Sequence, residues 1–417
     1  MKIAQHLSRY ATLLKWISSS LFFLFIFYSG IYKSWGMIKN DFPNYYVSSQ
    51  ILVQQKSYSI LYNDKQFNHE VNNFGIVQDS KFSQYPPLTA VIMIPLTGFD
   101  PLTAKNIWTV FNMLVLVSCL FLVKHIFSIS FTDTFFIFSL TGYSMINNFA
   151  FGQFYLVLLL LILLSVYSAE KGYASTAGFL LGFAAVIKII PVVIIIWFLI
   201  SGKRKAAIFS VFSALLFLLI ECIIFGTEIS SQYWLSILPG HLNSNLILQS
   251  PYAFSFQSWN SLLMNLFVYN SQFNPEPLYN SIFLFTFLKF IIYSVIAVLV
   301  ILNLRLMKNT VTETTADERF QILLIGSLLL LPASATYHFV LLAIPAAIII
   351  KSASYSIEQK SFQFLMIFLI GFIPLNHVNQ FHLTGFWTIF HYPRLICLSL
   401  LFIPISINFM KEKQFEN

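Results

Sequence analysis

The stretch Lys39-Asn40-Asp41-Phe42-Pro43-Asn44-Tyr45-Tyr46 follows the first long apolar segment and opens a polar loop that runs to residue 85. It places one carboxylate, Asp41, at the foot of that loop. Ionisable side chains are rare at a membrane and usually serve function there, so Asp41 is the first candidate for chemistry. It would act as a general base, kept ionised by Lys33 and Lys39. The alternative is a capping residue for a helix that begins near Pro43, and from residue chemistry alone that alternative leads.

The composition around this stretch is that of a membrane protein. The chain has 417 residues, of which 57% are hydrophobic and 10% charged. A soluble domain would carry roughly a quarter charged residues. The sequence therefore predicts an all-α polytopic membrane protein of about twelve transmembrane helices, with short helices in its outer loops. The net charge of +8 orients the short loops and indicates no nucleic-acid partner.

Basic residues before the first span, at Lys2, Arg9 and Lys15, predict a cytoplasmic N-terminus. We expect one integral membrane domain over residues 1–417 in a bacterial inner (plasma) membrane. Residues 32–85 form the first outer loop, and residues 227–280 form a second large one. The apolar run at 86–99 is short for a crossing, so we expect a re-entrant or surface helix there.

With this topology, the unusual polar residues fall on the outer side, which predicts a site that faces the periplasm. Lys188 interrupts an apolar stretch just before Pro191, at a cost of about 2.5–3.5 kcal/mol if it finds neither water nor a partner. It is a candidate ligand for a donor phosphate, and the alternative is a lysine that reaches the outer interface. His338 and Arg394 are the other candidate phosphate ligands.

Uncharged polar and aromatic residues are candidates for substrate binding: Tyr85, Gln153, Gln257 and Trp259. Amides donate and accept together, as sugar hydroxyls require. The alternative is that they are ordinary loop residues with interfacial aromatics. We expect neither metal nor cofactor, because His377, His382 and His391 lack ligand spacing and no nucleotide-binding motif is present. Cys119, Cys222 and Cys397 are expected to be unpaired.

Several short motifs occur in a familiar order: Asn40-Asp41-Phe42, Gln84-Tyr85-Pro86-Pro87-Leu88, Phe151-Gly152-Gln153, Gly178-Phe-Leu-Leu-Gly182, Ile187-Lys188-Ile189-Ile190-Pro191, Gln257-Ser258 and Tyr337-His338. In this order the chain resembles glycosyltransferase family 87, which groups polyprenol-phosphate-mannose-dependent mannosyltransferase-like enzymes of the GT-C superfamily. The family often has Asn after the Gly-Gln pair, whereas Phe154 stands here.

The resemblance implies a GT-C fold and an inverting hexosyltransferase that moves a hexose, with mannose favoured, from a polyprenyl-phosphate sugar to a glycolipid or glycan acceptor on the outer face. It implies that Asp41 is the base and that Lys188 and His338 lie near the donor phosphate. With the resemblance added, the base moves ahead of the cap. Two other functions stay open: a lipid-linked sugar flippase or transporter, and a polysaccharide polymerase or ligase that uses the 227–280 loop.

Overall fold

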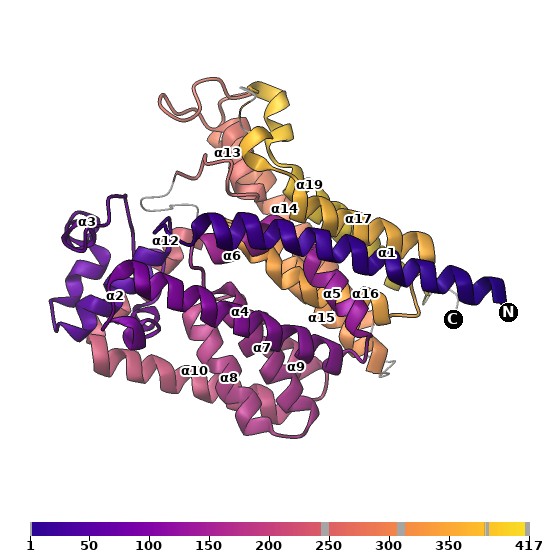
Figure 1. The fold of residues 1–417 in the computed structure, drawn as a ribbon. Coiled ribbons are helices and arrows are strands. Elements are labelled where there is room, and N and C mark those ends of the chain that lie inside the picture. Colours follow the sequence, from indigo (N-terminus) through magenta and orange to yellow (C-terminus); the bar gives the residue numbers. More distant parts are fainter. Residues whose placement is uncertain (1, 243–249, 307–312, 379, 381–382, 413–417) are drawn as a thin grey trace. The chain divides into compact units, whose positions relative to one another are not determined.

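The computed structural model describes residues 2–242, 250–306, 313–378, 380 and 383–412 (Figure 1). Across these ranges the secondary structure is helical, and the only β-pairing is an isolated bridge between Asn270 and Asn274. The predicted all-α class is therefore confirmed. The cysteines Cys119, Cys222 and Cys397 are free, as expected.

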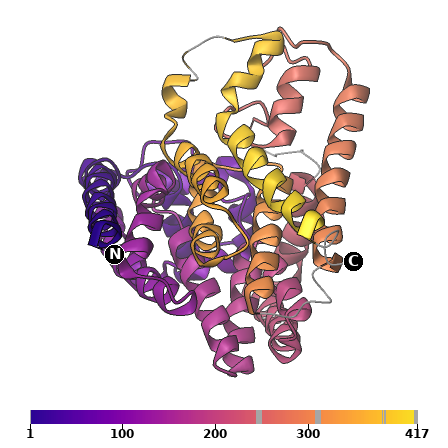
Figure 2. The same ribbon diagram turned by 90° about the vertical axis from the view of Figure 1, so that its right-hand side faces the viewer.

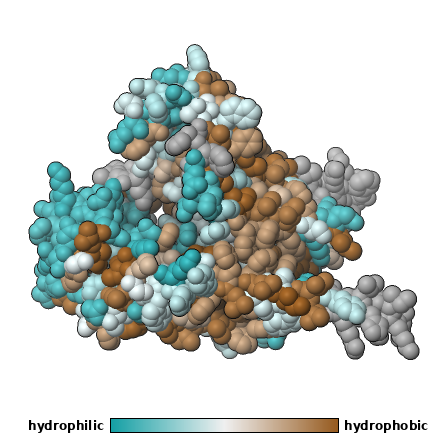
Figure 3. All heavy atoms as spheres, turned by 45° about the horizontal axis from the view of Figure 1, so that its top comes forward, coloured by the Kyte–Doolittle hydropathy of each residue, from teal (hydrophilic) through white to brown (hydrophobic). Residues whose placement is uncertain are grey.

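Four helical stretches of the described chain are long and apolar enough to cross a membrane. They are Thr12–Ser34, which runs from α1 (Lys2–Ile26) through the turns η1 (Phe27–Ile31) and η2 (Tyr32–Ser34), and the helices α4 (Pro101–Ile126), α10 (Arg204–Phe225) and α14 (Ile282–Leu306). The number rises to six if two bent helix pairs each count as one span. The protein is thus an integral membrane protein, and the larger number of twelve spans remains a prediction. Large apolar side chains are exposed along these helices, and apolar areas cover much of the face shown in Figure 3.

The chain divides into two compact units, which we describe separately. Unit 1 comprises residues 1–23, 123–144 and 249–417, and unit 2 comprises residues 24–122 and 145–248. Each unit is assembled from separated parts of the sequence.

In unit 2 the first polar loop forms the short helices that the sequence predicts. They are α2 (Phe42–Val53) and α3 (Asp64–Asn73), with the 3-10 helix η3 (Tyr58–Tyr62) between them. The side chain of Asn63 accepts a hydrogen bond from the Gln66 N–H and so caps α3. Nearly all of α2 is buried, since residues 42–51 lie inside the protein.

The apolar run after this loop forms two short 3-10 helices, η4 (Pro87–Val91) and η5 (Ile94–Leu96). Proline occupies the start of each, where its missing N–H costs nothing. Both are far shorter than the roughly 20 residues that a helical crossing needs. A re-entrant or surface position for this segment remains our prediction.

The rest of unit 2 is a helical stack of α7 (Tyr155–Glu170), α8 (Ala174–Ile187), α9 (Val192–Ile200) and α10. Helices α8 and α10 lie side by side (Figure 1). Gly178 and Gly182, one helical turn apart on α8, allow this approach: a Cβ at Gly178 would lie 2.3 Å from the Cβ of Phe209, and one at Gly182 would lie 2.5 Å from the Cβ of Ser213. The Gly-x-x-x-Gly spacing therefore serves close helix packing.

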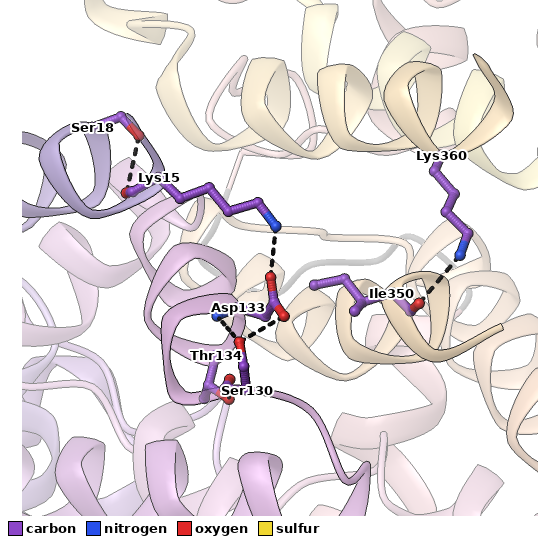
Figure 4. Close-up of polar contacts among 7 residues, drawn as sticks. All are labelled: Lys15, Ser18, Ser130, Asp133, Thr134, Ile350 and Lys360. Carbon is purple, nitrogen blue, oxygen red and sulfur yellow. Dashed lines mark hydrogen bonds and ion pairs between the residues drawn. The ribbon is translucent and has the colours of Figure 1, made fainter. Parts of the chain in front are cut away.

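Unit 1 contains α5 (Phe131–Ser139), α13 (Trp259–Phe267), α14, α15 (Glu313–Leu330), η8 (Thr336–Leu342), α16 (Ala343–Lys351), α17 (Ile357–Phe372) and α19 (Pro393–Glu412). Helices α14, α15, α17 and α19 pack around one another (Figure 2). An ion pair of 2.6 Å between Lys15 on α1 and Asp133 on α5 joins the N-terminal helix to this unit (Figure 4). Asp133 also accepts a hydrogen bond from Ser130, whose own oxygen caps α5.

Candidate functional site

Asp41 occupies the N-cap position of α2, but its side chain makes no capping hydrogen bond. The carboxylate instead accepts side-chain hydrogen bonds. Oδ2 accepts from Gln153 Nε2 at 2.5 Å, and Oδ1 accepts from Tyr85 Oη at 3.2 Å and from Asn44 Nδ2 at 3.3 Å. Asp41 is thus the N-cap residue by position, as the alternative expects, but its side chain does not cap α2. The carboxylate is held by residues that come from far along the chain.

The Gly152-Gln153 turn connects α6 (Gly142–Ala150) to α7 and is fixed by its surroundings. Gly152 has φ +64°, and Phe42 fills the space where a Cβ would lie, at 2.9 Å. A side chain at this position would be strained and would also clash. The indole of Trp108 donates to the Gly152 carbonyl at 3.0 Å. These contacts set the backbone from which Gln153, fully buried, points to Asp41.

Tyr45 determines which way the Gln153 amide faces. Its hydroxyl donates to Gln153 Oε1 at 3.0 Å, which leaves Nε2 directed to Asp41. Burial and the nearby Asp41 carboxylate raise the pKa of Tyr45 well above 10.0, so its hydroxyl stays a donor. The order Tyr45, Gln153, Asp41 is thus a relay of two oriented hydrogen bonds.

Lys188 lies in extended backbone between α8 and α9, where Pro191 prevents the helix from continuing. Its ammonium lies over two aromatic rings, 4.2 Å from the centroid of Tyr85 and 5.3 Å from that of Tyr155. The side chain is half-buried, and the hydrogen bonds among the described residues include none from its Nζ. The three ammonium donors therefore remain for a ligand.

Asp41 and Lys188 are electrostatically coupled. Burial raises the pKa of the Asp41 carboxyl above its ordinary value of 3.8, while the Lys188 ammonium and the hydrogen bonds from Gln153 and Tyr85 limit the rise. Tyr85 connects the two groups, because its hydroxyl contacts Asp41 and its ring contacts Lys188. A carboxylate with a raised pKa beside a cation is the kind of pair that active sites contain.

Sequence reasoning missed Glu221, which is fully buried on α10. Its Oε2 accepts from the Leu88 N–H at 3.0 Å, and its Oε1 accepts from Trp234 Nε1 at 2.8 Å. Leu88 belongs to η4, three residues after Tyr85. An acid inside a membrane helix is costly, and that cost should have marked it in the sequence.

An apolar cavity of about 340 Å³ lies in unit 2 beside the Gly152-Gln153 turn. Its lining side chains are all apolar: Ile92, Pro95, Leu96, Ile107, Trp108, Phe111, Phe154, Val157, Leu161 and Phe183. The Phe154 ring is stacked on that of Trp108. Phe154, which directly follows the Gly152-Gln153 pair, therefore lines an apolar space.

The remaining predicted residues belong to unit 1. Arg394 is buried, with Nη1 donating to Thr336 Oγ1 and Nη2 donating to the Ile373 carbonyl at 2.8 Å. His338 is buried two residues after Thr336, and the ring accepts a hydrogen bond at Nδ1 from the Ala335 N–H. The predicted phosphate ligands thus divide between the units, with Lys188 in unit 2 and the other two in unit 1.

The side-chain amide of Gln257 makes hydrogen bonds to backbone groups. Its Nε2 donates to the carbonyls of Phe254 and His391, and its Oε1 accepts from the Arg394 N–H. Trp259, half-buried, begins α13. Substrate binding by these two residues stays a prediction. Among the residues that the structure describes, no group of three metal-ligating side chains occurs, and His382 lies outside them.

These features define the class first: a membrane protein of apolar helices in which a carboxylate and a lysine contact the same tyrosine, at the end of a polar loop. The chain belongs to glycosyltransferase family 87, whose model matches residues 82–332, more than half of its length. It is therefore a membrane glycosyltransferase. No curated protein and no solved structure matches the chain. Tyr85, Gln153 and Lys188 lie within the matched region, and Asp41 precedes it.

Proposed function

We propose that the protein transfers a hexose, with mannose favoured, from a polyprenyl-phosphate sugar to a glycolipid or glycan acceptor, with inversion at the anomeric carbon. The observation that carries the proposal is the arrangement around Tyr85. Its hydroxyl contacts the Asp41 carboxylate, and its ring contacts an ammonium with free donors. One group accepts a proton and the other neutralises an anion, as transfer from a glycosyl phosphate requires.

In the proposed step, the acceptor hydroxyl oxygen attacks the anomeric carbon while Asp41 takes the hydroxyl proton. The bond from the anomeric carbon to the phosphate oxygen breaks, and its electron pair leaves with the polyprenyl phosphate. Lys188 neutralises the charge that develops on the departing phosphate. Tyr45 and Gln153 keep the Asp41 carboxylate in position for the proton, which is how fixed geometry lowers a barrier.

The donor's two parts suit two features of unit 2. The phosphate suits the Lys188 ammonium, and an isoprenoid chain suits the apolar cavity that Trp108 and Phe154 line. His338 and Arg394 are further candidates for the phosphate, and Tyr85, Gln153, Gln257 and Trp259 for the sugars. We propose a GT-C fold and a single membrane domain, with the site on the outer face of a bacterial inner membrane.

Transfer by the purified protein in proteoliposomes tests the proposal. Radiolabelled mannosyl phosphate lipid and glucosyl phosphate lipid are supplied with extracted membrane glycolipids as acceptors. We expect label in an acceptor, with the anomeric configuration opposite to that of the donor by NMR. Retained configuration contradicts the role of Asp41 as base. Movement of the labelled donor across the bilayer without transfer contradicts the enzyme and favours a flippase.

A further inference from the structure

The segment that precedes α19 in unit 1 carries an exposed aromatic surface. The 3-10 helix η9 (Gly385–His391) precedes α19 and is bent from it by 73°. Three of its side chains are exposed: Phe386 by 56%, Trp387 by 60% and Phe390 by 54%. The rings of Trp387 and Phe390 are stacked on each other, 5.8 Å apart. These three residues are the η9 aromatic face.

The opposite side of η9 is fixed to the protein. Thr388 and His391 are buried, and the His391 ring is stacked on Phe254 at 4.0 Å. The next residue, Tyr392, has its hydroxyl hydrogen-bonded to Ser261 Oγ and Asn265 Nδ2. The short helix is thus amphipathic, with a rigid inner side and an aromatic outer side.

Gln257 stabilises the bend itself. A break between two helices leaves backbone groups without helical partners. The Gln257 amide supplies both kinds of partner: Nε2 donates to the His391 carbonyl at 2.9 Å, and Oε1 accepts from the Arg394 N–H at 3.1 Å. The angle between η9 and α19 is therefore set by side-chain hydrogen bonds.

The bend decides what the aromatic face meets. Helix α19 passes as a candidate span together with η9, and we take α19 as the part that crosses the membrane. Transmembrane helices tilt by about 20° on average from the bilayer normal. A segment bent by 73° from such a helix lies near the membrane plane. Tryptophan and phenylalanine on a helix in that plane bind at the headgroup level. We propose that the η9 aromatic face binds the lipid headgroup interface and fixes the depth of unit 1 in the bilayer.

An exposed aromatic residue before the neighbouring helix α14 supports this placement. Helix α14 packs against α19, and both helices run in the same direction by the predicted topology. Tyr279 lies three residues before Ile282, where α14 begins, and is 63% exposed. Aromatic residues therefore precede two neighbouring spans at equivalent positions, as an interfacial belt requires.

Fluorescence quenching of the full-length protein in nanodiscs tests the proposal. The discs contain phosphatidylglycerol and phosphatidylcholine brominated either near the headgroup or near the chain end. The contribution of Trp387 is the difference between wild type and Trp387→Tyr. We expect this component to be quenched more by the shallow bromine than by the deep one, and little by aqueous acrylamide.

A double variant, Trp387→Tyr with Phe390→Trp, moves the indole to the next position on the same face. We expect it to restore the shallow quenching, which shows that the face, and not one residue, contacts lipid. A Trp387 component that acrylamide quenches strongly and brominated lipid leaves unchanged would overturn the proposal. The face would then point into water, where a glycan or a protein would be its partner.

Discussion

The amide of Gln153 donates a hydrogen bond to the carboxylate of Asp41, with Nε2 and Oδ2 2.5 Å apart. The two residues are separated by more than a hundred positions in the sequence. Because of this contact, the Asp41 side chain is held as an oriented, partly buried acid and does not cap α2.

Replacing Gln153 by Glu should move the acidic limb of the pH–rate profile upward. Two adjacent carboxylates cannot both ionise easily, so one proton stays in the pair at higher pH. The measurement is transfer activity against pH, with Gln153→Asn as a variant that shortens the amide without adding charge. An unchanged acidic limb in Gln153→Glu would show that the base is a different group.

Replacing Tyr45 by Phe should lower transfer activity by a smaller factor, because Tyr45 acts on Asp41 through Gln153. Without the hydroxyl, Gln153 Oε1 loses the donor that it accepts from, and the loss of one net hydrogen bond is worth about 0.5–1.5 kcal/mol. We expect lower kcat with little change in KM, since the sugar contacts are untouched. A rise in KM alone would mean that Tyr45 contacts substrate instead.

Lys188→Met should raise the pKa of Asp41, because the Lys188 ammonium lowers it in the wild type. The base must be ionised, so activity falls as pH falls through this pKa, and the acidic limb of kcat/KM should shift to higher pH. Lys188→Arg keeps the positive charge, so the acidic limb of kcat/KM should stay at the wild-type pH. If the acidic limb of kcat/KM lay at the same pH in wild type and in Lys188→Met, Lys188 would not be acting on the pKa of Asp41.

Glu221→Gln should destabilise the protein and reduce transfer. The amide offers one acceptor where the carboxylate offers two, so the Leu88 N–H or the indole of Trp234 loses its partner, at about 1–3 kcal/mol. A shift of η4 displaces Tyr85, so we expect a lower Tm together with a lower kcat. Glu228→Gln, exposed at the start of α11 (Thr227–Ser231), is the matched control. A stable Glu221→Gln with full activity would remove Glu221 from the site.

Gly182→Val should separate α8 from α10, because its side chain would occupy space held by Ser213. Overpacking of this kind costs about 1–3 kcal/mol. Gly98→Ala has open space around it and should leave Tm unchanged. The measurement is thermal unfolding in detergent, and equal Tm values for both variants would contradict the packing role.

The sequence is sufficient to predict the helical class, short helices in the first polar loop and the break at Lys188 and Pro191, because each follows from local composition. It leads away from the true position of the Asp41 side chain, because an Asp before a proline-bearing helix is an ordinary cap. Only the fold shows that the Asp41 carboxylate accepts hydrogen bonds from Tyr85 and Gln153 and makes no capping bond to the backbone of α2. Glu221 can be noticed as an acid within an apolar helix, but its contact with the Leu88 N–H, 133 residues away, is visible only in the fold.

The most direct measurement is transfer from a polyprenyl-phosphate sugar by wild type, Asp41→Asn and Asp64→Asn. Asp64 lies in the same polar loop and is also partly buried, so it controls for loss of a carboxylate. General-base catalysis contributes about 10²–10⁴-fold, and we predict a loss of that size in Asp41→Asn alone. Its Tm at neutral pH should change little, because the loss of one acceptor for the donors around Asp41 is offset by the removal of a carboxylate whose pKa burial raises. Full activity in a folded Asp41→Asn protein would contradict the central claim.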